Sequence, residues 1–501
     1  MAKEKEIIID RWDLGITDQE RDLPNGYFKY LENINTGDSI RGAAQNLNAT
    51  KSTGAYGEHF RSLRRVLKVG SEFWALGSDG TDTVMWSKEG TVWTVHTINA
   101  NYALDYRDNA FFVYDNGYLL FHNNEKIGLY KISGDNNNGD FLSLAGGLHG
   151  GIMWQGYAYG HTDNKIYKID VGNYTDSQTI TEMVTIPSDQ TIVQTIDYGN
   201  FMAIICTSTT NESLMYIWDG VTTTTFFDII NIGRGTVTGG VVLEGLITIA
   251  MESSKELLIK QYNEVVFQTI HRFSARADAS GDKDMNLGRV KEYNGYMYIL
   301  AIATRPAGTG TKGTPLLLRY GRRDVLSPVS FCVYKYFDYT PTTTSDFITD
   351  LLIHESVLAG VRSVPSYFAL VTEDDAGTAD AVMEEIQINA NKAVNVQVGI
   401  IETGIYTLDA SIKKKLTRVN VQLAPLPADG QVLIKYRKDE ETSWTTIATL
   451  TTDNTITNDS VNIEATGVNL PSFYEIAFRI ELSGGAEITR LKAKYEDEHG
   501  L

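Results

Sequence analysis

The sequence predicts an all-β protein in which a six- or seven-bladed β-propeller is followed by a C-terminal β-sandwich. Three observations carry this prediction: hairpin-like segments recur along the middle of the chain, short strand-like runs fill its last part, and the composition suits strands joined by tight turns. The chain of 501 residues contains 44 Gly and 27 Tyr but 10 Pro, and 21% of its residues are charged. The predicted order is an extended N-terminal arm or assembly segment over residues 1–54, the propeller over 55–387 and the sandwich over 388–501.

The recurring unit is a turn residue with an apolar strand, then a polar turn and a second strand rich in Ile, Leu and Tyr. The glycines that start successive copies are 47, 39, 43, 46 and 50 residues apart. A period in the forties built from hairpins is the size of one propeller blade, and a blade with two apolar faces has to stack against its neighbours. The copies begin at Gly70, Gly117, Gly156, Gly199, Gly245 and Gly295.

The pattern weakens after the last of these copies. A degenerate repeat is expected at Val357–Val361 with Tyr367–Val371, and Ala379–Gln387 is interpreted as a short helix or a connecting strand. From residue 388 onward, seven short runs broken by turn signals favour a β-sandwich. These runs are Val394–Ile401, Leu416–Leu423, Val432–Arg437, Trp444–Leu450, Ser460–Ile463, Tyr474–Leu482 and Thr489–Tyr495.

The first 50 residues hold one clear strand, Ile7–Ile9, ahead of polar, turn-rich sequence. This segment is interpreted either as an arm or as the source of a closing strand for the last blade. Because Ala2–Thr53 is polar and rich in Gly and Asn, we expect it to become ordered only on contact with partners.

Charge and cysteine content restrict the class of function. The 44 Lys and Arg against 63 Asp and Glu give a net charge of −19, which argues against a protein that wraps nucleic acid. Cys206 and Cys332 cannot form a disulfide framework and are interpreted as buried thiols. The N-terminus lacks an apolar signal-peptide core, and Gly239–Met251 is interrupted by Glu244 and is too short to span a bilayer. The sequence therefore predicts a protein made in the cytoplasm without a membrane segment.

Several acidic and basic segments are candidate sites of chemistry. Ser87–Trp93 resembles the sialidase Asp-box hairpin, but Glu replaces Asp and the spacing is one residue short; a hairpin is the simpler interpretation. A sialidase also needs three arginines on the sugar carboxylate, and Arg272 and Arg276 have no evident third partner. A glycosidase needs two carboxylates that face each other across the sugar. In a chain with 63 Asp and Glu such pairs occur by chance, so they do not identify a glycosidase. A Gly-rich loop with Asp278, Asp282 and Asp284 is a Ca²⁺ candidate, for which a solvated acidic loop is the alternative.

Other motifs fail on spacing or on missing partners. Asp135–Asp140 does not fit an EF-hand and is interpreted as a β-turn tip, and Arg305–Thr314 is interpreted as a long hairpin rather than a phosphate loop. His122 and His161 occupy equivalent places in successive repeats, and we assign them structural roles because a third metal ligand is missing. Lys413–Lys415 is interpreted as an exposed strand entrance or anion contact, or as a contact with an acidic partner subunit. We therefore assign no catalytic residue, no cofactor-binding residue and no metal ligand.

Two segments, one near each end of the chain, carry a further pattern. The first contains Asp13-Leu-Gly-Ile-Thr-Asp and Asp22-Leu-Pro-Asn-Gly, continuing to Asn35. The second covers about 100 residues and contains Thr403–Asp409, Ile412–Val421, Leu426–Arg437, Thr442–Ile447, Phe478–Leu482 and Ile488–Ala493. The first resembles the opening of phage virion proteins of the tail-nozzle (tail tubular B-like) and minor tail families, where it precedes a β-propeller. The second resembles the sandwich module that ends similar tail proteins. The resemblance implies a protein that acts by shape and assembly.

The sequence thus predicts a non-enzymatic structural component of a phage virion, in the tail, nozzle or connector region, made in the host cytoplasm. It is expected to form a cyclic ring with other copies of itself, to contact neighbouring tail or connector proteins, and to let DNA pass as a transient, non-specific passenger along an acidic lumen. The alternative is a carbohydrate-binding or carbohydrate-active propeller. In that alternative Trp86, Trp93, Trp154 and Trp218 stack on sugars instead of packing in the core.

Overall fold

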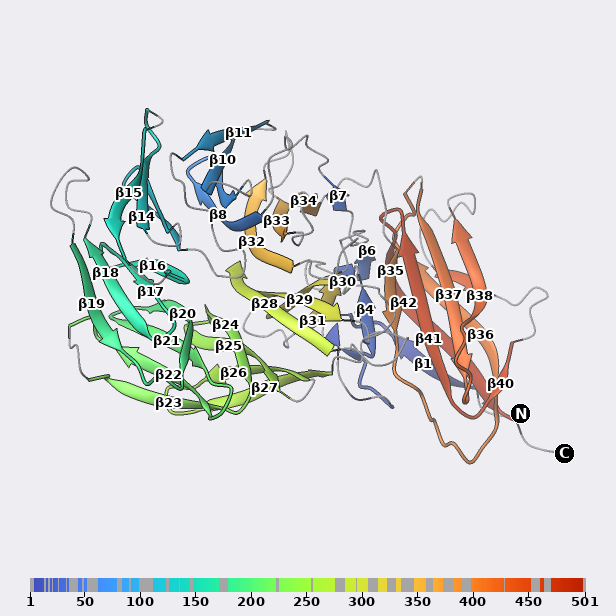
Figure 1. Ribbon diagram of the computed structural model, residues 1–501. Coiled ribbons are helices and arrows are strands. Elements are labelled where there is room, and N and C mark those ends of the chain that lie inside the picture. The colour runs from blue at the N-terminus through green and yellow to red at the C-terminus, as the bar shows by residue number, and fades with distance from the viewer. Residues whose placement is uncertain are drawn as a thin grey trace.

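The protein is all-β, as expected: the computed structural model contains many strands and no helix among the residues that it describes. The strands form a ring of small antiparallel sheets and, beside it, two larger sheets that contain the C-terminal strands (Figure 1). The structure describes residues 4–12, 15–16, 19, 21–25, 27–32, 34–35, 44–46, 49–51, 62–78, 83–89, 92–98, 111–122, 126–134, 136–144, 147–170, 179–221, 225–253, 256–274, 284–293, 295–304, 314–321, 330–334, 347–356, 364–372, 382–388, 398–427, 429–451, 460–463 and 470–498.

Five sheets of the ring each consist of four strands that follow one another along the chain. The first two are β8 (Ser62–Val69), β9 (Glu72–Ser78), β10 (Thr83–Glu89) and β11 (Val92–Thr97), then β12 (Phe112–Asp115), β13 (Tyr118–His122), β14 (Lys126–Lys131) and β15 (Asn136–Ser143). The third is β16 (Gly150–Trp154), β17 (Tyr157–His161), β18 (Lys165–Asp170) and β19 (Thr179–Thr185). The fourth and fifth are β20 (Thr191–Tyr198), β21 (Phe201–Thr207), β22 (Ser213–Trp218) and β23 (Asp228–Gly233), then β24 (Thr236–Leu243), β25 (Leu246–Ser253), β26 (Glu256–Tyr262) and β27 (Phe267–Ser274).

Two further sheets complete the ring. One begins with β28 (Asp284–Tyr293), β29 (Tyr296–Thr304), β30 (Thr314–Gly321) and β31 (Ser330–Tyr334), and the other with β32 (Phe347–Ser356), β33 (Val364–Thr372) and β34 (Val382–Ile388). The first strands of successive sheets contact one another from β8 through β12, β16, β20, β24 and β28 to β32, and β32 contacts β8 again. The sheets therefore close a circle, which Figure 1 shows around the left part of the molecule.

Tight turns at the repeat glycines join the first two strands of these sheets. Asn116 and Gly117 have φ of 46° and 91°, and Glu244 and Gly245 have φ of 51° and 81°. Positive φ at both central residues is typical of the type I′ turn, whose twist matches that of the flanking strands. The glycine period in the sequence is therefore the period of these hairpins, and the predicted strands at these copies are confirmed.

Three local predictions have different outcomes in the structure. In the degenerate repeat, the strand at Tyr367–Val371 is confirmed within β33, which pairs with β32 and β34, while Val357–Val361 lies outside the described residues. Of the two interpretations of Ala379–Gln387, the strand is confirmed: its described part lies in β34, which pairs with β33 and β7 within a sheet. Asp135–Asp140 is not a turn tip, because β15 starts at Asn136, which pairs with Lys131. Cross-strand pairing with β14 overrides the turn-forming composition there.

The ring is closely packed both between neighbouring sheets and within a sheet. Trp154 and Trp218, on adjacent sheets, are both at most 2% exposed, and their ring centroids lie 6.1 Å apart. In the second sheet, the side chain of Phe121 covers Gly128 on the paired strand, and a Cβ atom at Gly128 would lie 2.0 Å from the phenyl ring. Large aromatic residues therefore pack where the facing position is small, which gives the density of a protein interior.

Strands of the N-terminal segment pair with strands of the ring and with strands of the C-terminal region. Strand β7 (Ala49–Lys51) pairs with β34 and completes that four-stranded sheet, and β4 (Tyr30–Glu32) lies between β31 and β35 (Gly399–Glu402). The predicted strand at Ile7–Ile9 is confirmed within β1 (Lys5–Ile9), which pairs with β42 (Glu487–Asp497). These pairings within one chain differ from the expectation of a segment that becomes ordered only on contact with partners.

All seven runs predicted after residue 388 contain strands. One sheet of nine strands runs β28-β29-β30-β31-β4-β35-β41-β37-β38, with β37 (Gln431–Lys438), β38 (Thr445–Thr451) and β41 (Ile476–Ser483) at its far end. A second sheet contains β1, β5 (Ile34–Asn35), β6 (Ala44–Asn46), β36 (Lys414–Leu423), β39 (Ser460–Ile463), β40 (Ser472–Phe473) and β42. Side chains of both sheets, among them Ile434, Ile480, Val419 and Leu491, share one buried apolar cluster. The remaining described strands, β2 (Gly15–Ile16) and β3 (Tyr27–Phe28), form a short parallel pair.

Candidate functional site

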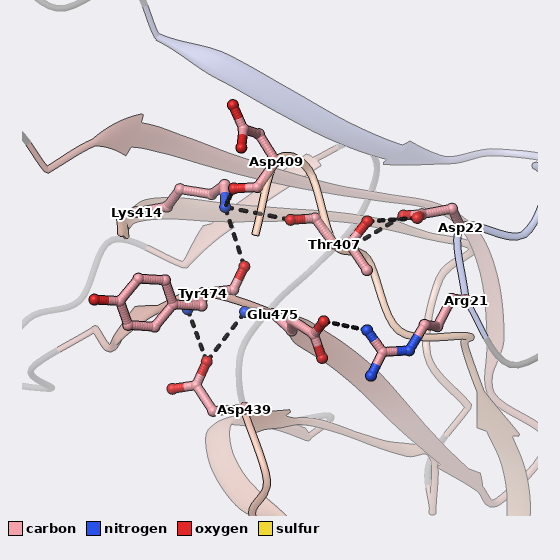
Figure 2. Close-up of polar contacts among 8 residues, drawn as sticks. All are labelled: Arg21, Asp22, Thr407, Asp409, Lys414, Asp439, Tyr474 and Glu475. Atoms are coloured by element: carbon pink, nitrogen blue, oxygen red, sulfur yellow. Dashed lines mark hydrogen bonds and ion pairs between the residues drawn. The ribbon is translucent and has the colours of Figure 1, made fainter. Parts of the chain in front are cut away.

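The N-terminal segment meets the C-terminal sheets at a polar junction (Figure 2), which we call the arm junction and define by Arg21, Asp22, Thr407, Asp409, Lys414, Asp439, Tyr474 and Glu475. The amide of Asp22 donates a hydrogen bond to the carbonyl oxygen of Ile405 at 2.8 Å. The carboxylate of Asp22 accepts hydrogen bonds from the amide and the hydroxyl of Thr407, the first at 2.9 Å. Arg21 forms an ion pair with Glu475. Two adjacent side chains of the arm thus attach it to two segments of the C-terminal region.

Lys414 is the buried centre of the arm junction. It is 0% exposed, and its Nζ donates to the carbonyl oxygens of Asp409 at 2.6 Å, Ile412 at 2.8 Å and Tyr474 at 3.0 Å. The carbonyl oxygen of Thr407 lies 3.3 Å away. Burial lowers the pKa of Lys414, and the negative charge of Asp409 opposes this shift. Carbonyl dipoles replace the water that a buried ammonium group loses.

The backbone of the arm junction adopts conformations that are uncommon outside glycine. Leu408 and Asp409 have φ of 47° and 78°. Asp439, in the turn between β37 and β38, has φ of 50°. The carboxylate of Asp439 accepts hydrogen bonds from the amides of Tyr474 at 2.7 Å and Glu475 at 3.1 Å. Lys414 and Asp439 thus fix irregular backbone through hydrogen bonds, and the lysine at the centre of the junction is closed to solvent. This arrangement suits mechanical attachment of the arm.

The basic run Lys413–Lys415 is therefore divided between two environments. Lys413 and Lys415 are exposed, and Lys413 lies 3.4 Å from the carboxylate of Glu498. Lys414 between them is buried, so the interpretation of the whole run as an exposed strand entrance was wrong for its middle residue. Side chains alternate between the two faces of a strand, which explains the division.

The tryptophans proposed to stack on sugars lie mostly in the core. Trp86, Trp154 and Trp218 are at most 2% exposed, so none of the three presents a ring to a ligand at the surface. Trp93 lies in β11, paired with Lys88, but its side chain is outside the described residues. Ser87–Trp93 forms the expected hairpin, in which β10 pairs with β11. These observations remove the residues on which the carbohydrate alternative rested, apart from Trp93.

The two repeat-equivalent histidines end β13 and β17 and are buried, with exposures of 3% for His122 and 2% for His161. Burial lowers the pKa of His122 to about 4, and the nearby charge of His149 adds to this effect. His149 Nε2 lies 3.3 Å from Asp163 Oδ1. Among the residues that the structure describes, no group of three or more His, Cys, Asp or Glu side chains is arranged to hold a metal ion.

The other sequence candidates are placed as follows. Cys206 is buried, and burial raises the pKa of its thiol; Cys332 lies in β31, with its side chain outside the described residues. Asp278, Asp282 and Arg276 lie outside the described residues, as does most of Arg305–Thr314, while Asp284 starts β28. Arg272 pairs with Glu256 at 3.3 Å. No helix of the described chain is long and apolar enough for a membrane span.

Sequence reasoning missed most of the arm junction. Asp22 and Thr407 are 385 residues apart, and nothing local marks them as partners. Asp439 lies in the turn after β37 beside two further acidic residues, which conceals its role as an acceptor for backbone amides. The one available signal was strand alternation around Lys414, which places the middle residue of the basic run on the inner face.

Comparison with known proteins assigns no family to the chain. No protein-family model matches it, and no curated protein matches it in sequence. The extracellular domain described as that of a one component system from B. thetaiotaomicron is similar at 12% identity over 81% of this chain and 46% of that chain, with a TM-score of 0.43. A computationally designed protein, Ika8, is similar at 9% identity over 65% of this chain and 83% of that chain, with a TM-score of 0.38. The N-terminal domain of Nup159 is similar at 9% identity over 76% of this chain and 89% of that chain, with a TM-score of 0.36.

Proposed function

We propose that the ring of sheets is a seven-bladed β-propeller and that the two sheets of the C-terminal region form a β-sandwich. Seven groups of four strands support this blade count, if β28–β31 are taken as one blade and β7 as the last strand of another. The contact between β32 and β8 supports closure of the ring. In this arrangement the N-terminal segment supplies the closing strand, which is one of the two interpretations that the sequence left open.

We propose further that the protein is a non-enzymatic structural component of a phage virion, in the tail, nozzle or connector region. The observation that carries this proposal is strand β4, which joins β31 of the ring to β35 of the C-terminal region within one nine-stranded sheet. Hydrogen-bonded strands that continue across two bodies resist bending between them, and this suits a component that transmits force in a particle. The arm that carries β4 is also the segment whose sequence resembles the opening of phage tail proteins.

The proposed assembly is a cyclic ring of copies through which the genome passes. Residues 55–387 contain 25 Lys and Arg against 39 Asp and Glu, so most of the net charge of −19 lies in the proposed propeller. Repeated around a ring, this charge repels the DNA backbone and lets the duplex slide without being held. Neighbouring tail or connector proteins are the other proposed partners.

Gold-labelled antibodies against the protein, applied to particles from the source culture, test this function. Label at one fixed place on a virus particle is the expected result and distinguishes neck, nozzle and tail tip. Label confined to material outside particles would overturn the proposal, and a glycan-binding and hydrolysis screen would then follow.

A second experiment tests the ring and the passage of DNA. Negative-stain images of the assembled protein are expected to show closed rings, and neutralising acidic residues that line the opening is expected to slow DNA ejection. Open or monomeric species inside intact particles would contradict the ring, and unchanged ejection kinetics would contradict the role of the charge.

A further inference from the structure

Exposed apolar side chains gather at the turns of two neighbouring sheets, β20–β23 and β24–β27. Val221 and Phe227 lie between β22 and β23, and are 78% and 72% exposed. Val265 and Val266 lie between β26 and β27, and are 74% and 48% exposed. We call these four residues the apolar turn surface. Turn tips usually carry polar residues, so four large apolar side chains in this position need an explanation.

The two turns lie at the same end of their sheets. Strands alternate in direction within each sheet, so the turn between the last two strands lies at the end where the first strand finishes. Only Arg234 and Gly235 separate β23 from β24, so β24 starts at the end of the sheet where β23 finishes. Both sheets therefore present these turns at the end opposite this connection. The strands that follow the two turns, β23 and β27, contact each other, so the turns lie on neighbouring parts of the surface. Burial raises the pKa of the Tyr262 hydroxyl, and the charges of Asp228 and Glu264 raise it further.

Local hydrogen bonds fix the backbone of these turns. The side-chain oxygen of Asn263 accepts hydrogen bonds from the amides of Val265 at 3.2 Å and Val266 at 2.9 Å. The carboxylate of Asp219 accepts one from the amide of Val221 at 2.9 Å, and the ring of Phe227 packs on Phe201 with centroids 4.7 Å apart. The turns thus hold their apolar side chains outward in a defined arrangement, which lowers the entropy lost on binding.

Acidic residues predominate around the apolar turn surface. Residues 189–274, which span both sheets, contain nine Asp and Glu against four Lys and Arg. Of the basic residues, Arg234 lies at the other end of the sheets, Lys260 donates a hydrogen bond to the carbonyl oxygen of Ile232, and Arg272 pairs with Glu256. The acidic residues at the turn end are Asp197, Asp219, Asp228, Glu244 and Glu264. Acidic groups around an apolar centre repel an acidic partner and attract a basic one. A second copy of this chain, which is acidic itself, is therefore the poorer match.

We propose that the apolar turn surface docks a protein partner through a basic segment that carries apolar anchor side chains. Burial of Phe227 and Val265 against such anchors supplies affinity, and the surrounding carboxylates select the partner by charge. The proposal goes beyond the virion assignment and holds wherever the protein acts. The result of its test is therefore independent of the antibody-labelling result.

Binding of synthetic peptides to the full-length protein tests this surface by fluorescence anisotropy. One peptide set places Lys or Arg on both sides of a single Phe, Leu or Trp, and a matched set has Glu at each basic position. We expect binding of the basic set alone, weakened by salt because the attraction is between exposed charges. Absence of binding, or equal binding of the acidic set, would overturn the proposal.

Two variants separate the apolar contribution from the electrostatic one. Phe227→Ser combined with Val265→Ser is expected to weaken binding about tenfold or more. Glu244→Asn combined with Glu264→Asn removes two charges at positions with φ of 51° and 71°, which asparagine accepts, and is expected to reduce the salt dependence. Val95→Ser, at a residue that is 44% exposed on β11, is the control. Unchanged affinity in the first variant, or self-association abolished by it, would overturn the proposed occupant.

Discussion

The ammonium nitrogen of Lys414 lies 2.6 Å from the backbone carbonyl oxygen of Asp409, a residue whose φ is 78°. Because the same nitrogen reaches Tyr474 at 3.0 Å, one side chain fixes two segments that are far apart in the sequence. Replacement of Lys414 by Met leaves buried carbonyl oxygens without their donor. We expect Lys414→Met to lower the free energy of unfolding by about 3 kcal/mol, measured by chemical denaturation.

The neighbouring lysine provides the control for this prediction. Lys413 makes a partly exposed ion pair with Glu498, and the Lys413→Met variant keeps the backbone and a side chain of similar length. An exposed pair of this kind contributes about 0.5 kcal/mol. Equal effects of the two substitutions would show that general loss of charge, and not the carbonyl contacts of Lys414, decides stability.

The burial of Lys414 was only partly predictable. Lys414, Lys415 and Leu416 are buried, exposed and buried along β36, which is the alternation expected of a strand with one covered face. The sequence does not reveal what covers the inner position, because the carbonyl oxygen of Tyr474 is supplied from 60 residues away. Long-range contacts of this kind have no local signal, whereas alternation does.

The same distinction separates the predicted fold from the parts that were missed. The glycine turns and the apolar strands of the hairpins are local features, so their period identified the repeating sheets. Strands β4 and β7 contain three residues each and pair with segments hundreds of residues away. Such short strands in polar sequence gain their stability from the sheet edge that receives them, and no local pattern marks them.

A second prediction concerns the contact of Phe121 with Gly128. A Cβ atom at Gly128 would lie 2.0 Å from the phenyl ring, so Gly128→Ala forces Phe121 out of its position in a packed core. We expect a loss of about 2 kcal/mol in the free energy of unfolding. Gly147→Ala is the control, because its Cβ would meet His122 at an ordinary 3.7 Å. A Gly128→Ala variant as stable as the control would contradict the tight packing.

A third prediction concerns the order of the N-terminal segment in the free protein. Trp12 is 0% exposed, stacks on Phe28 with centroids 5.5 Å apart, and donates from Nε1 to the carbonyl oxygen of Thr489 at 3.0 Å. We expect trypsin to cleave slowly at Arg11 and Arg21 in the wild-type protein and much faster in Trp12→Ala, as followed by mass spectrometry. Truncation of a buried Trp costs about 3 to 5 kcal/mol, enough to release this segment. Rapid cleavage of the free wild-type protein would instead support an arm that orders only on contact with partners.

The last prediction concerns the acid sensitivity that His122 gives to the fold. Burial lowers the pKa of His122 from 6.5 to about 4, so the unfolded chain takes up a proton at a higher pH than the folded protein does. The contribution of the neutral, buried His122 side chain to the free energy of unfolding is therefore complete above pH 6.5 and is lost as the pH falls from 6.5 to about 4. Linkage converts this shift into a loss of about 3 kcal/mol in the free energy of unfolding. Because carboxylates also titrate in this range, the measured quantity is the difference between wild type and His122→Gln at neutral pH and near pH 4. The glutamine variant should lose less stability on acidification; parallel losses in the two proteins would mean that His122 is not the group responsible.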